Sequence, residues 1–235
     1  MRDRRGIGHA VTGKHRFLCE MAGRLEGEAV LDLGCGIGWF EDYAGRQGCA
    51  RVVGMDNDEV RLELARRRAP EAVFISGDAT VIDEDIGTFT LVAMFDFLEH
   101  LPRHSVPNVL RNVANLLEPG GRLLISVPYK GLLSTTLDTT YYLGHRHYKP
   151  LEIQALLDDV GFEISRVQYG GGIWEHISMI WLYIFKWVFA REMPFSAFLE
   201  KKRLGEYQSP SSIPGSASAT LFVEAVGKDG KEEHE

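Results

Sequence analysis

The chain has 235 residues, 45% of them hydrophobic and 25% charged, which is the composition of an ordinary globular protein with one main domain. Its net charge of −7 argues against a nucleic-acid partner, because binding phosphates needs clustered Lys and Arg side chains. The three cysteines form no C-x-x-C pair, which predicts neither a disulfide framework nor a metal site and favours a reducing, cytoplasmic setting.

Strand and helix patterns alternate along the chain after a lead-in helix at residues 9–25. The strands are apolar without polar alternation, which predicts a parallel sheet covered by helices on both faces. We therefore expect an α/β fold with a doubly wound, seven-stranded sheet. The expected strands are residues 29–33, 51–55, 72–76, 89–95, 122–127, 162–169 and 219–226, with helices at 39–47, 59–68, 103–117 and 151–160.

A glycine-rich turn follows the first expected strand. From Asp32 to Gly38 it reads D-L-G-C-G-I-G, at the strand end where open α/β sheets bind ligands. The dinucleotide pattern G-x-G-x-x-G would need a glycine at position 39, where this chain has Trp39. An acidic residue at position 32 suits a sulfonium cation and an ammonium group better than a pyrophosphate.

At this turn the chain resembles the class I S-adenosylmethionine (SAM)-dependent methyltransferases, particularly the small-molecule and quinone-pathway O-methyltransferase types. Further family landmarks follow the second, third and fourth strands at Asp56, Asp78 and Asp96, and Glu118 opens the family's turn before strand five. The resemblance covers residues 28–169 and the last strand. Taken singly, the glycines could be plain turn residues, and Asp56 and Asp78 could be helix N-caps.

The resemblance implies a Rossmann-like fold, SAM as cofactor with S-adenosylhomocysteine (SAH) as product, and methyl transfer to oxygen or nitrogen of a small or amphipathic acceptor. A SAM-binding protein without catalysis and a nucleotide-dependent oxidoreductase are the alternatives. The expected cofactor-binding residues are Asp32, Gly34, Cys35, Gly36, Gly38, Asp56, Asn57, Asp78, Ala79, Phe95, Asp96 and Phe97.

Three histidines are candidate catalytic residues on the acceptor side: His100, His145 and His147. One helical turn would bring Asp96, Glu99 and His100 to a shared face. This arrangement would give a histidine base oriented by a carboxylate, or part of a metal site as in some quinone-pathway relatives. Alternatively, Glu99 and His100 merely hydrogen-bond the loop. The loop at residues 144–150 carries the other two histidines, either as bases or as ordinary loop residues.

The segment at residues 171–208 interrupts the last two strands and is strongly apolar between residues 174 and 190. It must bury itself as a lid over the acceptor, in a homodimer interface, or on a membrane surface, where a lipid-linked acceptor would be found. We therefore divide the chain into a SAM-binding core (1–170), this insertion (171–208), a linker with the last strand (209–227) and a disordered tail (228–235).

Overall fold

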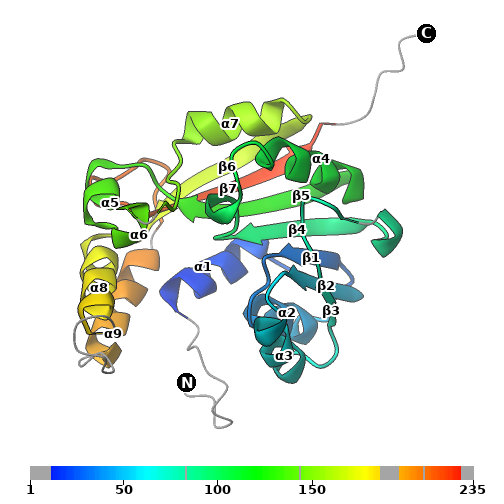
Figure 1. Cartoon of the computed structure of the whole chain (residues 1–235), viewed down its shortest axis with the longest axis horizontal. Helices are drawn as coiled ribbons and strands as arrows, with labels where there is room; N and C mark the ends of the chain where they lie inside the picture. The colour runs from blue at the N-terminus through cyan, green and yellow to red at the C-terminus, as the bar shows by residue number, and fades with distance from the viewer. Residues whose placement is uncertain (1–11, 83, 143, 186–195, 209, 229–235) are drawn as a thin grey trace. The chain divides into compact units, whose positions relative to one another are not determined.

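The computed structural model describes residues 12–82, 84–142, 144–185, 196–208 and 210–228. Their central feature is a seven-stranded sheet with the order β3-β2-β1-β4-β5-β7-β6 (Figure 1). β1 pairs in parallel with β2 and β4, and β2 pairs in parallel with β3. The expected α/β sheet is confirmed. The strands are β1 (Ala29–Leu33), β2 (Arg51–Asp56), β3 (Val73–Ser76), β4 (Phe89–Phe95), β5 (Leu117–Pro128), β6 (Phe162–Gly170) and β7 (Thr220–Gly227).

The chain divides into two compact units. The larger unit comprises residues 22–125, 151–166 and 223–235, and the smaller unit comprises residues 1–21, 126–150 and 167–222. Each unit joins segments that are distant in sequence, so the division into consecutive segments stays a prediction.

In the larger unit, apolar helix faces pack to form the core. The helices are α2 (Trp39–Arg46), α3 (Glu59–Arg68), α4 (Val106–Leu116) and α7 (Pro150–Asp158). In α4, Val106, Val109, Leu110 and Val113 are buried, which is the i, i+3, i+4, i+7 spacing of one helix face. This core holds the carboxyl ends of β1 to β4 at one edge of the sheet, because parallel strands point the same way.

The smaller unit contains α1 (Gly13–Ala22), α5 (Leu132–Leu137), α6 (Thr139–Tyr142), α8 (Ile173–Tyr183) and α9 (Ser196–Tyr207). Helix α1 is shorter than the expected helix at residues 9–25, because Gly23 takes a left-handed φ of 72° directly after it. Residues 9–11 lie outside the described part of the chain. The expected insertion contributes α8 and α9, which lie side by side (Figure 1).

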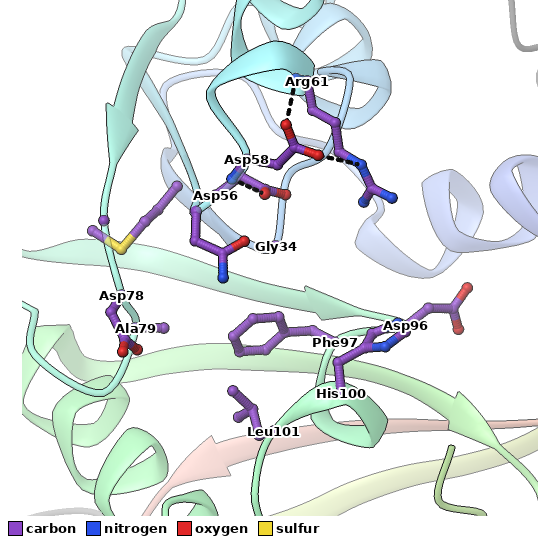
Figure 2. Close-up of a pocket in the computed structure, with 13 residues that line it drawn as sticks. Gly34, Asp56, Asp58, Arg61, Asp78, Ala79, Asp96, Phe97, His100 and Leu101 are labelled. Carbon is purple, nitrogen blue, oxygen red and sulfur yellow. Dashed lines mark hydrogen bonds and ion pairs between the residues drawn. The ribbon is translucent and has the colours of Figure 1, made fainter. Parts of the chain in front are cut away.

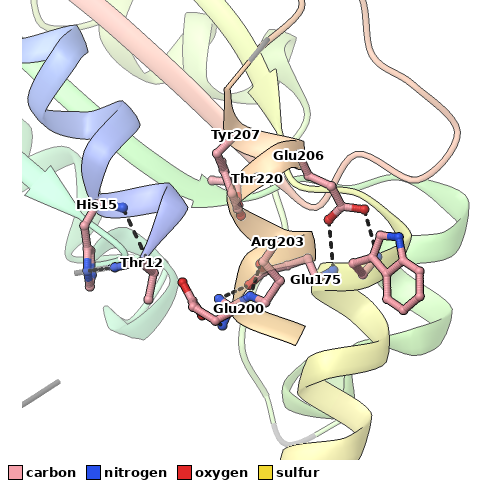
Figure 3. Close-up of polar contacts among 9 residues, drawn as sticks. Thr12, His15, Glu175, Glu200, Arg203, Glu206, Tyr207 and Thr220 are labelled. Atoms are coloured by element: carbon pink, nitrogen blue, oxygen red, sulfur yellow. Dashed lines mark hydrogen bonds and ion pairs between the residues drawn. The ribbon is translucent and has the colours of Figure 1, made fainter. Parts of the chain in front are cut away.

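Polar contacts join α8 to α9 at one end of this pair (Figure 3). The Glu206 carboxylate accepts hydrogen bonds from the backbone N–H groups of Trp174 at 2.8 Å and Glu175 at 3.0 Å, so α9 caps the N-terminus of α8. The Arg203 guanidinium donates to both carboxylate oxygens of Glu175. In the described part of the chain, no helix has the length and apolar character needed to cross a membrane.

Candidate active site

The turn between β1 and α2 takes a backbone path that requires glycine. Gly34, Gly36 and Gly38 have φ angles of 81°, 55° and 72°. A Cβ atom on Gly34 would lie 2.5 Å from the Phe97 ring. The Gly34 and Cys35 N–H groups both donate to the Met55 carbonyl of β2. The turn is therefore held against β2 and leaves no room for a side chain at position 34.

Asp56 at the end of β2 fixes the same turn from the other side. One carboxylate oxygen accepts from the Gly36 N–H at 2.8 Å, and the other accepts from the Asp58 N–H at 2.9 Å. A carboxylate oxygen can accept more than one hydrogen bond, so both retain capacity for ligand hydroxyl groups. Asp58 in turn caps α3 by accepting from the Val60 and Arg61 N–H groups.

A pocket of about 390 Å³ opens at the carboxyl ends of β1 to β4 (Figure 2). Asp56 and Asp58 approach it from one side, and Phe97 and His100 approach it from the other. The lining residues are Gly34, Met55, Asp56, Asn57, Asp58, Arg61, Gly77, Asp78, Ala79, Asp96, Phe97, His100 and Leu101.

The chemistry of this lining fits SAM. Four of the lining residues are aspartates, and the Arg61 guanidinium, the one Lys or Arg group among them, is 3.4 Å from the Asp58 carboxylate. An acidic lining suits a ligand with ribose hydroxyls, an exocyclic amine, an ammonium group and a sulfonium cation. Asp78 is fixed at the end of β3 because its carboxylate accepts from the Thr80 N–H at 2.8 Å. Asp96 has a φ of 50°, the left-handed region that is uncommon for residues other than glycine.

Seven of the twelve expected cofactor residues line this pocket, and two of the others, Phe95 and Asp32, are buried. Phe95 is buried against the rings of Trp39 and Phe40, at centroid distances of 5.7 and 5.0 Å. Asp32, only 2% exposed, lies below the turn together with Glu41 of α2. Direct cofactor contacts stay predictions for all of the expected residues, of which five do not line the pocket: Asp32, Cys35, Gly36, Gly38 and Phe95.

Sequence reasoning missed several residues at this site. Met55 and Asp58 lie within two residues of Asp56, and Arg61 lies in the first turn of α3, so their position near a landmark is an available signal. Leu101 lines the pocket after His100, also without having been singled out. Glu41 is the least expected, because a glutamate in the first turn of a helix ordinarily faces solvent.

His100 and Glu99 point to different surroundings. Residues Leu98–His100 form a 3₁₀ turn in which His100 is exposed and lines the pocket, whereas Glu99 is buried and does not line it. The prediction that Glu99 shares a face with Asp96 and His100 is therefore wrong. The tighter 3₁₀ turn and the left-handed Asp96 give a spacing that differs from an α-helix. Among the described residues, no group of three or more His, Cys, Asp or Glu side chains could hold a metal ion.

The other two candidate histidines belong to the smaller unit. The His147 Nε2 lies 3.0 Å from the Asp138 carboxylate, and both side chains are buried. The Tyr141 ring packs against the same imidazole at 5.0 Å between centroids. His145 is half-buried. A carboxylate therefore orients His147, but a role of either histidine at the acceptor stays a prediction.

Comparisons with known proteins identify the family. The sequence profile of a family described as a methyltransferase domain matches residues 9–167. A ubiquinone biosynthesis O-methyltransferase of Bordetella avium is 32% identical over 176 residues, which cover 67% of this chain and 71% of that protein. The chain spans about half to two-thirds of the length of several further relatives.

Solved structures share the fold at lower identity. A SAM-dependent methyltransferase from Mesorhizobium loti superposes with a TM-score of 0.66 at 19% identity, covering 94% of this chain and all of that one. Magnesium protoporphyrin IX methyltransferase from Synechocystis PCC 6803, with bound SAH, gives a TM-score of 0.60 at 21% identity and covers 92% and 82%. The glycine-rich turn, the acidic pocket and these matches lead to one conclusion: the chain belongs to the class I SAM-dependent methyltransferases and uses SAM as its cofactor.

Proposed function

We propose that this methyltransferase acts on a hydroxyl group of a small amphipathic acceptor, with the His100 imidazole removing the hydroxyl proton. SAM supplies the electrophilic methyl group carried on its sulfonium. The imidazole nitrogen accepts the proton from the acceptor oxygen and returns it to water, since His100 is exposed.

The observation that carries this proposal is that His100 lines the same pocket as Asp56, Asp78 and Asp96. Histidine ordinarily changes its charge near neutral pH and is the commonest general base in enzymes. The Bordetella relative is named for ubiquinone biosynthesis, which supports an acceptor of the quinone-ring type with a ring hydroxyl and an apolar chain.

A series of catechols with 4-alkyl chains of increasing length tests the proposal. In the variant His100→Ala, we expect kcat/KM to fall about 100-fold, the usual contribution of a general base, while the Kd for SAM changes less than about twofold. His104→Ala is the matched control, because His104 is exposed in the same loop and lies outside the pocket lining. Unchanged turnover in His100→Ala would refute the base role. Methylation of alkylamines but of no catechol would move the acceptor to nitrogen.

We also propose that α8 and α9 contact a membrane surface. Helix α8 buries polar side chains and exposes apolar ones. Glu175 and His176 are buried, whereas Ile177 and Leu182 are 38% and 46% exposed. The buried polar groups have partners, because Glu175 pairs with Arg203 and the His176 Nε2 lies 3.2 Å from the Ala217 carbonyl. A helix that buries its polar face favours apolar surroundings for the opposite face.

Aromatic side chains and a lysine lie beside the exposed apolar residues of α8. Ile177, Trp181, Phe198 and Leu199 line a cavity of about 420 Å³ between the two helices. The Lys202 ammonium lies 5.3 Å from the Trp174 ring and 5.6 Å from the Phe198 ring, measured to the centroids. Apolar and aromatic side chains beside lysines are typical of segments that lie in the interface of an anionic bilayer.

Co-sedimentation with phosphatidylglycerol vesicles and with phosphatidylcholine vesicles tests the membrane contact. We expect binding to the anionic vesicles and a severalfold loss in Lys201→Glu/Lys202→Glu, since each basic residue contributes about 1 kcal/mol near such a surface. Equal sedimentation of the wild type and the double variant would contradict the proposal. A dimer in light scattering that the substitution Leu182→Asp dissociates would assign the apolar face to a second copy instead.

A further inference from the structure

We propose that Glu41 is a positioning residue that shares a proton with Asp32 beneath the glycine-rich turn and thereby sets the preference of the site for cationic SAM over SAH. The proposal rests on SAM as the cofactor and is independent of the acceptor. It concerns a glutamate that lies outside the pocket lining and that no sequence landmark marks.

Glu41 is packed where a glutamate is not normally found. Its side chain extends from the first turn of α2 toward β2 and is 1% exposed. Gly54 of β2 makes room for it, since a Cβ atom at that position would lie 2.4 Å from the Glu41 Oε1. Among the described residues, neither carboxylate oxygen of Glu41, nor the Oδ1 of Asp32, has a partner in full hydrogen-bond geometry. Buried carboxylates ordinarily have such partners.

The two carboxyl groups satisfy each other when one proton lies between them. Burial raises the pKa of Asp32, and repulsion by Glu41 and Asp56 raises it further. Burial also raises the pKa of Glu41 to about 8, with Asp56 adding to the rise, whereas a backbone hydrogen bond, the hydrogen bond with Asp32 and the Arg68 guanidinium of α3 oppose it. Burial and these carboxylates raise the pKa of the Cys35 thiol as well, so it contributes no further charge near neutral pH. Glu41 therefore holds its proton at neutral pH and releases it near pH 8.

Asp56 connects this pair to the ligand. Its carboxylate is close enough to raise the pKa of both Asp32 and Glu41, and it also lines the pocket and holds the Gly36 N–H. A negative charge gained beneath the turn would therefore act on a cation in the pocket through a poorly solvated layer. SAM carries a sulfonium charge that SAH lacks, so only SAM gains from ionisation of the pair.

Thermodynamic linkage makes this inference measurable. A ligand that binds more tightly to the ionised pair must release protons when it binds at a pH near or below the pKa of the pair. We expect SAM to release more protons than SAH near pH 8, the pKa of Glu41. We also expect the ratio of SAM to SAH affinity to rise roughly fivefold as the pair ionises, an effect of the size that one charge exerts across a partly screened interior.

Isothermal titration of SAM and of SAH in two buffers of different ionisation enthalpy gives the proton release for each ligand. In Glu41→Gln the amide keeps the shape and donates to Asp32, but it cannot ionise. We expect the excess proton release of SAM over SAH that Glu41 causes to be absent in this variant. Glu63→Gln is the control, because Glu63 is exposed on α3 beside Arg67. The ammonium group of SAM itself contributes equally in all three proteins.

Equal proton release by Glu41→Gln and the wild type would overturn the inference. If Glu41→Gln does not fold, the wild type alone decides: a SAM to SAH affinity ratio that is independent of pH through the pKa of about 8 would also overturn it.

Discussion

The pocket at the sheet edge differs from the α8–α9 pair in how its side chains are packed. At the pocket, backbone N–H groups and carboxylates fix a turn so tightly that Gly34 has no space for a Cβ atom. In the α8–α9 pair, polar contacts at Glu206 and Arg203 secure one end and leave apolar side chains exposed. The first region therefore holds a rigid pocket for SAM, and the second leaves an apolar surface.

Substitution of Gly34 should have the largest effect on the pocket side of this comparison. In Gly34→Ala, the new Cβ atom would clash with Phe97, and the left-handed φ of 81° would be strained. We expect SAM affinity in isothermal titration to fall more than about 100-fold and stability to fall by about 1–3 kcal/mol. Gly45→Ala is the control: its Cβ has open space within α2, so it should be neutral or stabilising. SAM binding by Gly34→Ala at wild-type affinity would disprove the close approach at this turn.

Asp56 should follow in size. In Asp56→Asn, an amide N–H group replaces one acceptor oxygen and must face either the Gly36 or the Asp58 N–H. We expect the Kd for SAM to rise about tenfold, the size of one lost hydrogen bond to a charged group. Asp42→Asn on the outer side of α2, where Asp42 pairs with Arg46, should change the Kd by less than about twofold. If the two variants bind SAM equally well, Asp56 has no special role.

Glu206 tests the other region. In Glu206→Ala, the Trp174 and Glu175 N–H groups lose their acceptor, so the N-terminus of α8 is no longer capped. We expect a loss of about 1–2 kcal/mol in urea unfolding and faster amide exchange in α8, with SAM affinity unchanged. Glu200→Ala removes only the partly exposed partner of Arg203 and should cost less than about 0.5 kcal/mol. A weakened SAM affinity in Glu206→Ala would show that the two regions are coupled.

The pH dependence of stability tests the buried Glu41 on the pocket side. Because its pKa is raised in the folded state from 4.5 to about 8, the folded protein holds a proton that the unfolded chain has lost, and stability falls as pH rises across this window. In Glu41→Gln this contribution is absent. The melting temperature of the variant relative to the wild type should therefore rise between about pH 5 and 8 and then level off. A constant difference would mean that Glu41 does not titrate in this range.

The sequence predicts the residues that line the pocket better than the buried residues behind them. Asp56, Asp78 and Asp96 follow β2, β3 and β4, and parallel strands bring such residues to one edge, so order and spacing sufficed. The burial of Glu41 and Glu99 could not be predicted in the same way, because helical spacing does not show that a carboxyl group turns inward. For Glu41 the one available signal was Gly54, whose missing side chain makes the space.

The acceptor side shows the same limit. His100 is predictable because it follows a landmark strand. The 3₁₀ turn in which Glu99 is buried and His100 exposed follows the left-handed Asp96, which the sequence does not reveal. His147 was singled out for its neighbours in a loop, whereas its partner, Asp138, is a residue that sequence reasoning passed over.

A crystal structure with bound SAH tests the central claim most directly. We predict that the ribose hydroxyls lie at the Asp56 carboxylate, that the adenine amine lies near Asp78, and that the sulfur faces the part of the pocket lined by Asp96 and His100. Glu41 should remain outside the contact distance of the ligand. SAH bound elsewhere, or seated in this pocket without contact to Asp56, would contradict the account.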